Sequence, residues 1–371
     1  MLDDLKIAIV CDWLTVYAGA ERVIFEIHKL FPKAPIYTSL YNKEKCFLFK
    51  DADVRESWLK YVPGARNFHQ LFLPFMPRIF EDMDFSEFDL VISSSHSVAK
   101  GIITKPNTLH VSYCHSPMRY AWDQSHAYVK NYKTFRPLSL VYKPILHKIR
   151  IWDKAAADRV DQFVANSDFV KARIQKYYRR DSKVVFPPVD LSFFSPANEK
   201  RDAYIAVGRL IPYKKFDLLV QAANKFGFKL KIVGVGSEIN KLKKMAHSNI
   251  EFLGKVSDQR LMEEYQKSKA LVFPQLEDFG IVPLEAIASG TPVIAFNGGG
   301  AKETVSDGVS GIFFDEQSVD SIGEAIKRFE KKKWDENKVA NSIEKFSQAH
   351  FKAKLLNFLE KAWTEHQEML A

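Results

Sequence analysis

Cysteine is scarce in this chain, and so are long apolar runs. Only three cysteines, Cys11, Cys46 and Cys114, occur in 371 residues. They are odd in number and far apart, which argues against a disulfide framework and a zinc ribbon. No apolar run approaches the roughly 20 residues that span a bilayer, and the N-terminus carries acids where a secretory signal carries bases. The sequence therefore predicts a cytoplasmic protein that does not cross a membrane.

Excess positive charge is absent from most of the chain. The net charge is +9, but residues 188–371 hold 26 Lys and Arg against 25 Asp and Glu. Residues 130–183 alone hold 14 basic and 5 acidic residues. A single basic segment of this kind attracts an anionic surface, such as membrane phosphates, nucleic acid or an acidic substrate.

Short apolar runs alternate with helical stretches along the whole chain. Most of the runs are rich in Val, Ile and Phe without polar alternation, as strands buried on both faces are. The alternation predicts βαβ units, parallel sheets and an α/β fold. The predicted strands are Lys6–Asp12, Pro35–Ser39, Asp89–Ser94, His110–Cys114, Gln162–Asn166, Lys183–Phe186, Tyr204–Val207, Lys229–Val233, Ile250–Leu253, Ala270–Phe273, Pro292–Phe296 and Gly311–Phe314.

A chain of 371 residues is too long for one compact core and fits two α/β domains. Two prolines and a polar run around residue 190 predict the linker between them. We therefore assign residues 1–190 to an N-terminal domain and residues 191–349 to a C-terminal domain. No strand is predicted after Phe314. The tail, roughly 318–370, is expected to be helical, with an apolar face formed by Trp334, Phe346, Phe351, Leu355, Phe358, Leu359 and Trp363.

The strongest local signal is the run from Glu277 to Glu285, which follows the strand predicted at 270–273. In open α/β sheets ligands bind beyond the carboxyl ends of strands, and a helix start offers backbone N–H groups to a phosphate. Gly280 lets a phosphate approach that backbone closely. One carboxylate is placed for a sugar and the other for a ribose diol. The alternative is two solvated acids on an amphipathic helix, and spacing alone leaves both readings open.

A second signal follows the strand predicted at 204–207. Arg209 and Lys214 are candidates to converge on a diphosphate, since Arg makes forked hydrogen bonds and Lys supplies a point charge. The alternative is an ordinary surface loop. The later Gly234-Val-Gly236 turn lacks the third glycine of the dinucleotide fingerprint and is interpreted as a tight turn.

Two further signals lie in the N-terminal half. Gly19 and Ala20 follow the first predicted strand and open a helix, where they are candidates to face donor phosphates. His115 directly follows the strand predicted at 110–114 and is a candidate to face a cleft. The structural alternatives are an ordinary turn for the first pair and a histidine without a binding role for the second.

Together and in this order, these motifs resemble glycosyltransferase family 4, whose retaining enzymes have the GT-B fold of two Rossmann-like domains facing a cleft. The family's Glu-x7-Glu motif appears as Glu277 and Glu285, and its phosphate-binding pair as Arg209 and Lys214. The stretch 113–123 looks closest to a bacterial subgroup that builds O-antigens and other surface polysaccharides, often from GDP-mannose. In this fold the final helix, here 350–371, usually crosses back to the N-terminal domain.

The resemblance implies a metal-independent transfer that needs no cofactor beyond its nucleotide-sugar substrate. Glu285 would hold the ribose, Arg209 and Lys214 would neutralise the leaving diphosphate, and Glu277 would contact the transferred sugar. His115 would bind that sugar and help stabilise the transition state. The remaining donor-binding positions implied by the resemblance are Gly19, Ala20, Phe279, Gly280, Ile281 and Val282.

The family resemblance suggests a role for the basic segment in binding a membrane surface. Residues 130–150 hold six Lys and Arg and no acid, and residues 68–80 form a strongly apolar run. Both lie in the domain expected to bind a lipid-linked or saccharide acceptor. The sequence analysis therefore predicts peripheral contact with anionic lipid on the inner face of the cytoplasmic membrane. The alternative is an apolar core segment beside a solvated helix face.

Other functions fit less well. An epimerase of the same architecture would bind the same donor and remains the nearest alternative. A metal-dependent transferase would need an Asp-x-Asp site, and the two literal matches, at 51–53 and 82–84, follow no convincing buried strand. An NAD-dependent dehydrogenase is disfavoured because no complete Gly-x-Gly-x-x-Gly follows a first strand. A nucleic-acid-binding module is disfavoured because the sequence holds no recognised binding motif.

Overall fold

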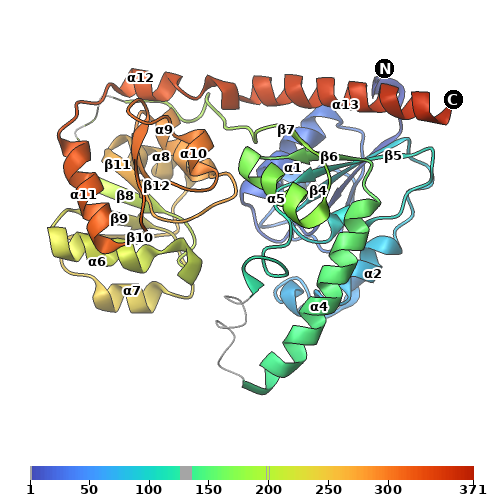
Figure 1. Cartoon of the computed structure of the whole chain (residues 1–371), viewed down its shortest axis with the longest axis horizontal. Helices are drawn as coiled ribbons and strands as arrows, with labels where there is room; N and C mark the ends of the chain where they lie inside the picture. The colour runs from blue at the N-terminus through green and yellow to red at the C-terminus, as the bar shows by residue number, and fades with distance from the viewer. Residues whose placement is uncertain (1, 126–135, 198, 200) are drawn as a thin grey trace. The chain divides into compact units, whose positions relative to one another are not determined.

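The computed structural model describes residues 2–125, 136–197, 199 and 201–371 (Figure 1). It divides into two compact units. The first unit is Met1–Pro187 together with Ala349–Ala371, and the second is Pro188–Gln348. The sequence analysis placed these divisions at residues 190 and 349.

The first unit is built on a seven-stranded sheet in the order β3-β2-β1-β4-β5-β6-β7, with parallel pairing throughout. Its strands are β1 (Ile7–Cys11), β2 (Ile36–Thr38), β3 (Val54–Glu56), β4 (Leu90–Ser95), β5 (Leu109–Cys114), β6 (Gln162–Ala165) and β7 (Lys183–Val184). Its α-helices are α1 (Gly19–Leu30), α2 (Met76–Glu81), α4 (Arg136–Asp158), α5 (Asp168–Tyr178) and α13 (Gln348–Leu370). Its 3-10 helices are η1 (Leu2–Asp4), η2 (Phe47–Phe49), η3 (Trp58–Tyr61), η4 (His69–Phe72) and η5 (Ala99–Gly101).

Both faces of this sheet are covered. Ile7, Ile9 and Cys11 of β1 lie in one core cluster with residues of α1 and α13, whereas Ala8 and Val10 lie in another with residues of α2 and α4. The alternation follows from the two-residue period of a strand. Because both faces of the sheet are covered, the strands appear in the sequence as continuous apolar runs. The expectation that the final helix packs on the N-terminal domain is confirmed, since α13 buries its apolar face there, at Phe351, Leu355, Leu359 and Ala362.

The second unit is built on a six-stranded parallel sheet in the order β10-β9-β8-β11-β12-β13. Helices α6, α7 and α11 lie together on one face, and α8, α9, α10 and α12 on the other (Figure 1). The strands are β8 (Ala203–Val207), β9 (Leu230–Val233), β10 (Ile250–Gly254), β11 (Ser268–Phe273), β12 (Val293–Phe296) and β13 (Gly311–Phe314). The helices are α6 (Phe216–Phe226), α7 (Ile239–Met245), α8 (Asp258–Gln266), α9 (Ile281–Ala288), α10 (Ala301–Thr304), α11 (Val319–Glu330) and α12 (Glu336–Asn341), with 3-10 helices η6 (Pro212–Lys214) and η7 (Glu344–Phe346).

Two expectations from the sequence need correction. The analysis predicted no strand near β3, because this three-residue strand at the sheet edge carries Arg55 and Glu56 in place of an apolar run. The tail is not one apolar face. Trp334 packs on Phe329 in the core of the second unit, with ring centroids 5.1 Å apart, and only the residues from Phe351 onward pack in the first.

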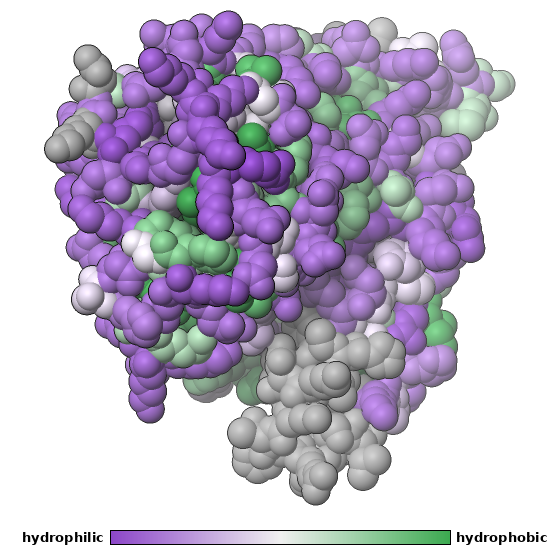
Figure 2. Space-filling view, turned by 60° about the vertical axis from the view of Figure 1, so that its left-hand side comes forward, coloured by the Kyte–Doolittle hydropathy of each residue, from purple (hydrophilic) through white to green (hydrophobic). Residues whose placement is uncertain are grey.

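The face drawn in Figure 2 is largely hydrophilic, with small apolar patches between the polar side chains. None of the helices, over the residues that the structure describes, is long and apolar enough to cross a bilayer.

Candidate functional site

The second sheet brings the predicted donor-site residues to one place. Its strand order reverses between β8 and β11, which are hydrogen-bonded neighbours although β9 and β10 separate them in the chain. Ligands of doubly wound sheets bind at such a reversal, beyond the carboxyl ends of the two strands. Arg209 and Lys214 follow β8, and Glu277 and Gly280 follow β11, so the sheet topology places all four residues around that point.

Two of these residues touch. The Lys214 ammonium forms an ion pair with the Glu277 carboxylate, and the two side chains are 14% and 16% exposed. Arg209 lies on the same loop as Lys214, with its side chain exposed. The pairing argues against the reading of Glu277 as a solvated surface acid. A sheltered cation beside a sheltered anion is suited to a ligand that carries phosphate and hydroxyl groups.

The start of α9 has the predicted geometry. Gly280 caps the helix with φ of 95°, a left-handed conformation that L-residues with a side chain rarely adopt. Ile281 and Val282 form the first turn and are partly buried, while Phe279 is buried with its ring 5.7 Å from that of Phe346. The helix start therefore offers backbone N–H groups at the positive end of a helix dipole.

Glu285 is buried rather than solvated. It is 4% exposed on α9, a helix that is buried from Pro283 to Ala288. The Tyr265 hydroxyl donates a hydrogen bond to its carboxylate at 3.3 Å. A buried carboxylate needs such partners, and the placement excludes the amphipathic-helix alternative.

The sequence analysis missed a glycine run that supports this loop. The N–H of Gly300 donates to the Glu277 carbonyl at 2.9 Å. A Cβ on Gly299 would lie 2.2 Å from that carbonyl oxygen, and one on Gly300 would lie 2.3 Å from Phe279 Cα. The sequence did carry a signal for this contact, because three consecutive glycines follow β12, the neighbour of β11 in the sheet.

The Gly234-Val-Gly236 turn packs in the same way. A Cβ on Gly234 would lie 1.9 Å from the Gly208 carbonyl oxygen, and one on Gly236 would lie 2.3 Å from that of Leu210. These glycines permit one loop to pack against the loop that carries Arg209, which fits their interpretation as a tight turn.

The other predicted residues belong to the first unit. Gly19 and Ala20 open α1, as expected from the sequence, and both are partly exposed. His115 directly follows β5, and its Nε2 lies 2.8 Å from Ser94 Oγ. The Asn166 amide donates to the His115 carbonyl at 3.0 Å.

No candidate metal site is found in the described part of the chain: it holds no cluster of three or more His, Cys, Asp or Glu placed to share an ion. The Asp-x-Asp acids sit elsewhere in the first unit. Asp53 pairs with Arg55, and Asp82 pairs with Arg78. Of the basic segment 130–150, residues 130–135 lie outside the described residues.

Two family models match consecutive parts of this chain. The model for Glycosyltransferase Family 4 matches residues 17–193, and the model for Glycosyl transferases group 1 matches residues 190–349. The chain belongs to glycosyltransferase family 4. The residues gathered around β8 and β11 are its candidate donor site.

Curated relatives of this chain match it over part of their length. A GDP-mannose-dependent alpha-(1-6)-phosphatidylinositol monomannoside mannosyltransferase of Mycobacterium tuberculosis is 34% identical over 34% of this chain and 38% of the relative. A D-inositol 3-phosphate glycosyltransferase of Mycolicibacterium smegmatis is 30% identical over 48% of each. The chain thus spans about half or less of the length of these relatives.

Solved structures share the whole fold. Anabaena HepE, solved with UDP and glucose, has a TM-score of 0.68 at 17% identity and covers 96% of this chain and 99% of HepE. WaaG, a glycosyltransferase involved in lipopolysaccharide biosynthesis, has a TM-score of 0.64 at 16% identity and covers 94% and 99%. These matches confirm the GT-B fold with its two Rossmann-like domains.

Proposed function

We propose that this protein transfers mannose from GDP-mannose to a lipid-linked or saccharide acceptor in surface polysaccharide biosynthesis, with retention and without a metal. The observation that carries the proposal is the Lys214–Glu277 ion pair beside the start of α9. The names of the mannosyltransferase relative and of WaaG support the sugar and the pathway.

The transfer balances without a further reactant. The bond between C1 of the sugar and the diphosphate oxygen breaks, and its electron pair stays on that oxygen. The acceptor hydroxyl oxygen bonds to C1 on the same face. Its proton passes to the leaving phosphate.

Each donor-site residue has a role in this proposal. Lys214 and Arg209 neutralise the diphosphate, helped by the N–H groups at the start of α9. Glu277 accepts hydrogen bonds from hydroxyls of the transferred sugar, and Glu285 accepts them from the ribose. The family resemblance also assigns His115, Gly19 and Ala20 to donor binding. Donor binding requires Lys214 to share its charge between Glu277 and the phosphate.

Saturation-transfer NMR tests the donor site. The full chain is titrated with GDP-mannose, UDP-glucose, UDP-N-acetylglucosamine and dTDP-rhamnose, each with and without EDTA. We expect GDP-mannose to bind in EDTA. Arg209→Ala and Lys214→Ala should each weaken it by about 10- to 100-fold, since a charge-assisted hydrogen bond contributes about 1.5–3 kcal/mol.

Lys215→Ala is the matched control, because Lys215 is the neighbouring cation and makes no ion pair with Glu277. Equal losses in Lys214→Ala and Lys215→Ala, or binding that needs a divalent metal, would refute the proposal. Product analysis with the donor alone separates the epimerase alternative, which would change the sugar without an acceptor.

The same proposal includes membrane contact through the first unit. The apolar run 68–80 divides in the structure. Its later residues Met76, Ile79 and Phe80 are core, whereas Phe68 and Leu71 are 62% and 73% exposed. Phe75 in the same run is also exposed, as are Trp58 and Tyr61 of the preceding η3. The cations beside these residues in the sequence are Lys60, Arg66 and Arg78. Apolar surface flanked by cations suits an anionic bilayer.

Sedimentation with phosphatidylglycerol vesicles tests this contact. We expect the full chain to pellet with these vesicles, less so at high salt, because salt screens the cations. Phe68→Ser/Leu71→Ser/Phe75→Ser should abolish pelleting. Val309→Ser, at a 46% exposed apolar residue of the second unit, should not. Pelleting unchanged in the triple variant would contradict the contact.

A further inference from the structure

The first sheet reverses its strand order in the same way as the second. β1 and β4 are hydrogen-bonded neighbours, although β2 and β3 lie between them in the chain. Asp12 directly follows β1 and His96 directly follows β4, so both lie at the reversal where doubly wound sheets bind ligands. In the second unit, the Lys214–Glu277 pair occupies the corresponding place.

Asp12 is held by an unusual number of hydrogen bonds. It is 1% exposed, and its carboxylate accepts from the backbone N–H groups of His96 at 2.7 Å, Ser97 at 3.1 Å, Val98 at 2.6 Å and Ala99 at 2.7 Å. The His96 ring also contacts it, with Nδ1 2.9 Å from the carboxylate. Burial acts to raise the pKa of Asp12, but the imidazole and the hydrogen bonds outweigh it and lower that pKa to about 2. Asp12 is therefore ionised at neutral pH, and Nδ1 of His96 is the donor in their contact.

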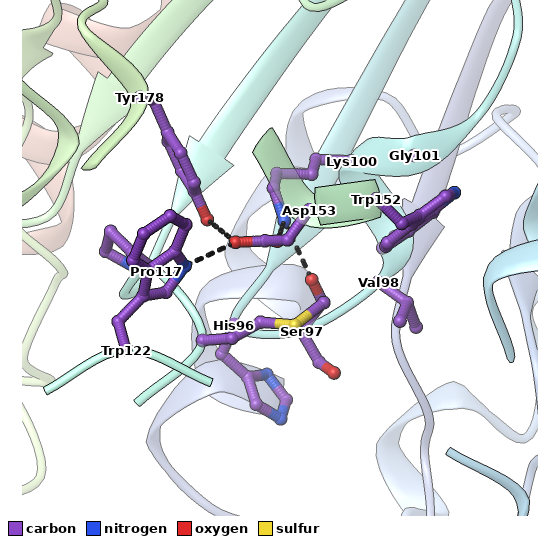
Figure 3. Close-up of polar contacts among 12 residues, drawn as sticks. His96, Ser97, Val98, Lys100, Gly101, Pro117, Trp122, Trp152, Asp153 and Tyr178 are labelled. Atoms are coloured by element: carbon purple, nitrogen blue, oxygen red, sulfur yellow. Dashed lines mark hydrogen bonds and ion pairs between the residues drawn. The ribbon is translucent and has the colours of Figure 1, made fainter. Parts of the chain in front are cut away.

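The segment after His96 is anchored at its other end as well. Lys100 is buried and forms an ion pair with Asp153 of α4, and its ammonium donates to the Ser97 carbonyl at 2.9 Å (Figure 3). The Trp122 indole N–H at 2.7 Å and the Tyr178 hydroxyl at 2.9 Å also donate to Asp153. These contacts fix the backbone on both sides of the segment, so His96 is held in one position.

The surroundings of His96 are aromatic. The Trp13 ring lies edge-on to His96, with the ring centroids 4.8 Å apart, and the His69 ring packs on Trp13 with its centroid also 4.8 Å away. His115, the predicted sugar-binding histidine, has its ring centroid 6.5 Å from that of His96. The His96 side chain is 34% exposed. Aromatic rings pack against the C–H faces of a sugar, and an imidazole at their edge hydrogen-bonds its hydroxyls.

A purely structural role accounts for only part of this arrangement. The four backbone N–H groups already satisfy the buried Asp12 carboxylate. Stability alone therefore does not require a third-exposed imidazole on the same carboxylate. The contact fixes the tautomer and orientation of His96, as a carboxylate does for a histidine that acts on a substrate.

We propose that His96, oriented by Asp12, binds the hydroxyl of an uncharged saccharide acceptor, with Trp13 and His69 flanking the sugar ring. Nδ1 of His96 faces Asp12, and Nε2 is the ring nitrogen that forms the hydrogen bond with that hydroxyl. The inference rests on the proposed function, because it names the acceptor side of the same transfer.

NMR of the full chain labelled with ¹³C-histidine tests the inference. The probe is octyl α-D-mannopyranoside below its micelle concentration, titrated without donor. We expect the Cε1–H signals of His96 and His69 to shift. His96→Asn should weaken probe binding by about tenfold, the effect of losing one such hydrogen bond. The asparagine amide retains a donor where Nδ1 faces Asp12, and the variant therefore keeps the local fold.

His28→Gln is the control, because His28 lies on α1 and is likewise partly exposed. It should leave probe affinity unchanged, and His96→Asn should leave the GDP-mannose dissociation constant unchanged. The inference fails if the probe moves neither signal, if His96→Asn binds it as tightly as the wild type, or if inorganic diphosphate moves both signals and the glycoside does not. Failure of the wild type to bind any donor would instead refute the proposed function, since the glycoside titration contains no donor.

Discussion

At the scale of single residues, His110 on β5 makes the first unit sensitive to acid. It is fully buried, and Nε2 lies 2.9 Å from Ser93 Oγ. Burial, and then the charge of Arg159, lower the pKa of His110 to about 3 from its usual 6.5. Below pH 6.5 the unfolded chain therefore binds a proton that the folded chain does not, and the free energy of unfolding falls as the pH falls from 6.5 toward 3.

We expect the protonation of His110 in the unfolded chain to lower the free energy of unfolding by about 2 kcal/mol between pH 7 and pH 5, at about 1.36 kcal/mol per pKa unit. Urea titration followed by tryptophan fluorescence measures it, because five of the six tryptophans lie in the first unit. His110→Asn should reduce the difference between the two pH values by that amount, whereas the exposed His247→Gln should not. An unchanged pH dependence in His110→Asn would contradict the assignment.

Gly300 is the residue on which the donor loop depends most directly. It has ordinary helical φ, so steric contact alone excludes a side chain there. A Cβ would lie 2.3 Å from Phe279 Cα, so Gly300→Ala must displace the loop that carries Glu277 and Gly280. We expect GDP-mannose affinity to fall at least tenfold while the second unit stays folded, measured by NMR titration and circular dichroism.

Gly227→Ala is the comparison. Gly227 has φ of 73° and open space around the position of a Cβ. The variant should therefore lose about 1 kcal/mol through backbone strain and keep its donor affinity. If Gly300→Ala binds the donor normally, the glycine run does not support the loop.

At the scale of elements, the buried Lys100–Asp153 pair joins η5 to α4. Lys100→Met removes one partner and leaves the Asp153 charge buried beside Trp122 and Tyr178. Such a change costs about 3–5 kcal/mol. The exposed Lys154–Asp158 pair on the same helix provides the contrast, and Lys154→Ala should cost under about 0.5 kcal/mol. Urea unfolding of the two variants measures both, and a loss under about 1 kcal/mol in Lys100→Met would show that the pair adds little.

Most strands could be predicted because burial on both faces makes them apolar, although β7 and β10 are only partly buried. The sequence analysis missed β3. That strand lies at the sheet edge, where Arg55 and Glu56 face solvent at least in part. The single residues of the donor site could be predicted because each follows a predicted strand. The Lys214–Glu277 contact itself depends on β8 and β11 being neighbours, which their separation in the chain conceals.

The Asp12–His96 contact was missed for the same reason. The two residues are 84 positions apart, and they meet because β1 pairs with β4. Periodicity identifies strands but does not give their order in a sheet. A signal was still present, since each residue is a polar side chain directly after a buried strand.

At the scale of the whole molecule, the chain leaves the first unit at Pro187 and returns to it at Ala349, so the second unit is one continuous insertion. The helix α13 buries Phe351, Leu355 and Leu359 against the core of the first unit. Removing residues 349–371 would expose that core and leave the second unit intact. We therefore expect the truncated chain to unfold in two steps, with the first unit destabilised and the second unchanged.

Hydrogen exchange with mass spectrometry separates the two outcomes. In the truncated chain, protection should fall in β1, β4 and α1 and persist in β8, β11 and α9, because only the first three lie against α13 or share its core cluster. GDP-mannose should still bind, because the loops after β8 and β11 belong to the second unit. Substituting only the exposed end, with Met369→Ser at a 74% exposed residue, should leave protection unchanged. Uniform loss of protection in both units on truncation would show that the two units do not unfold independently.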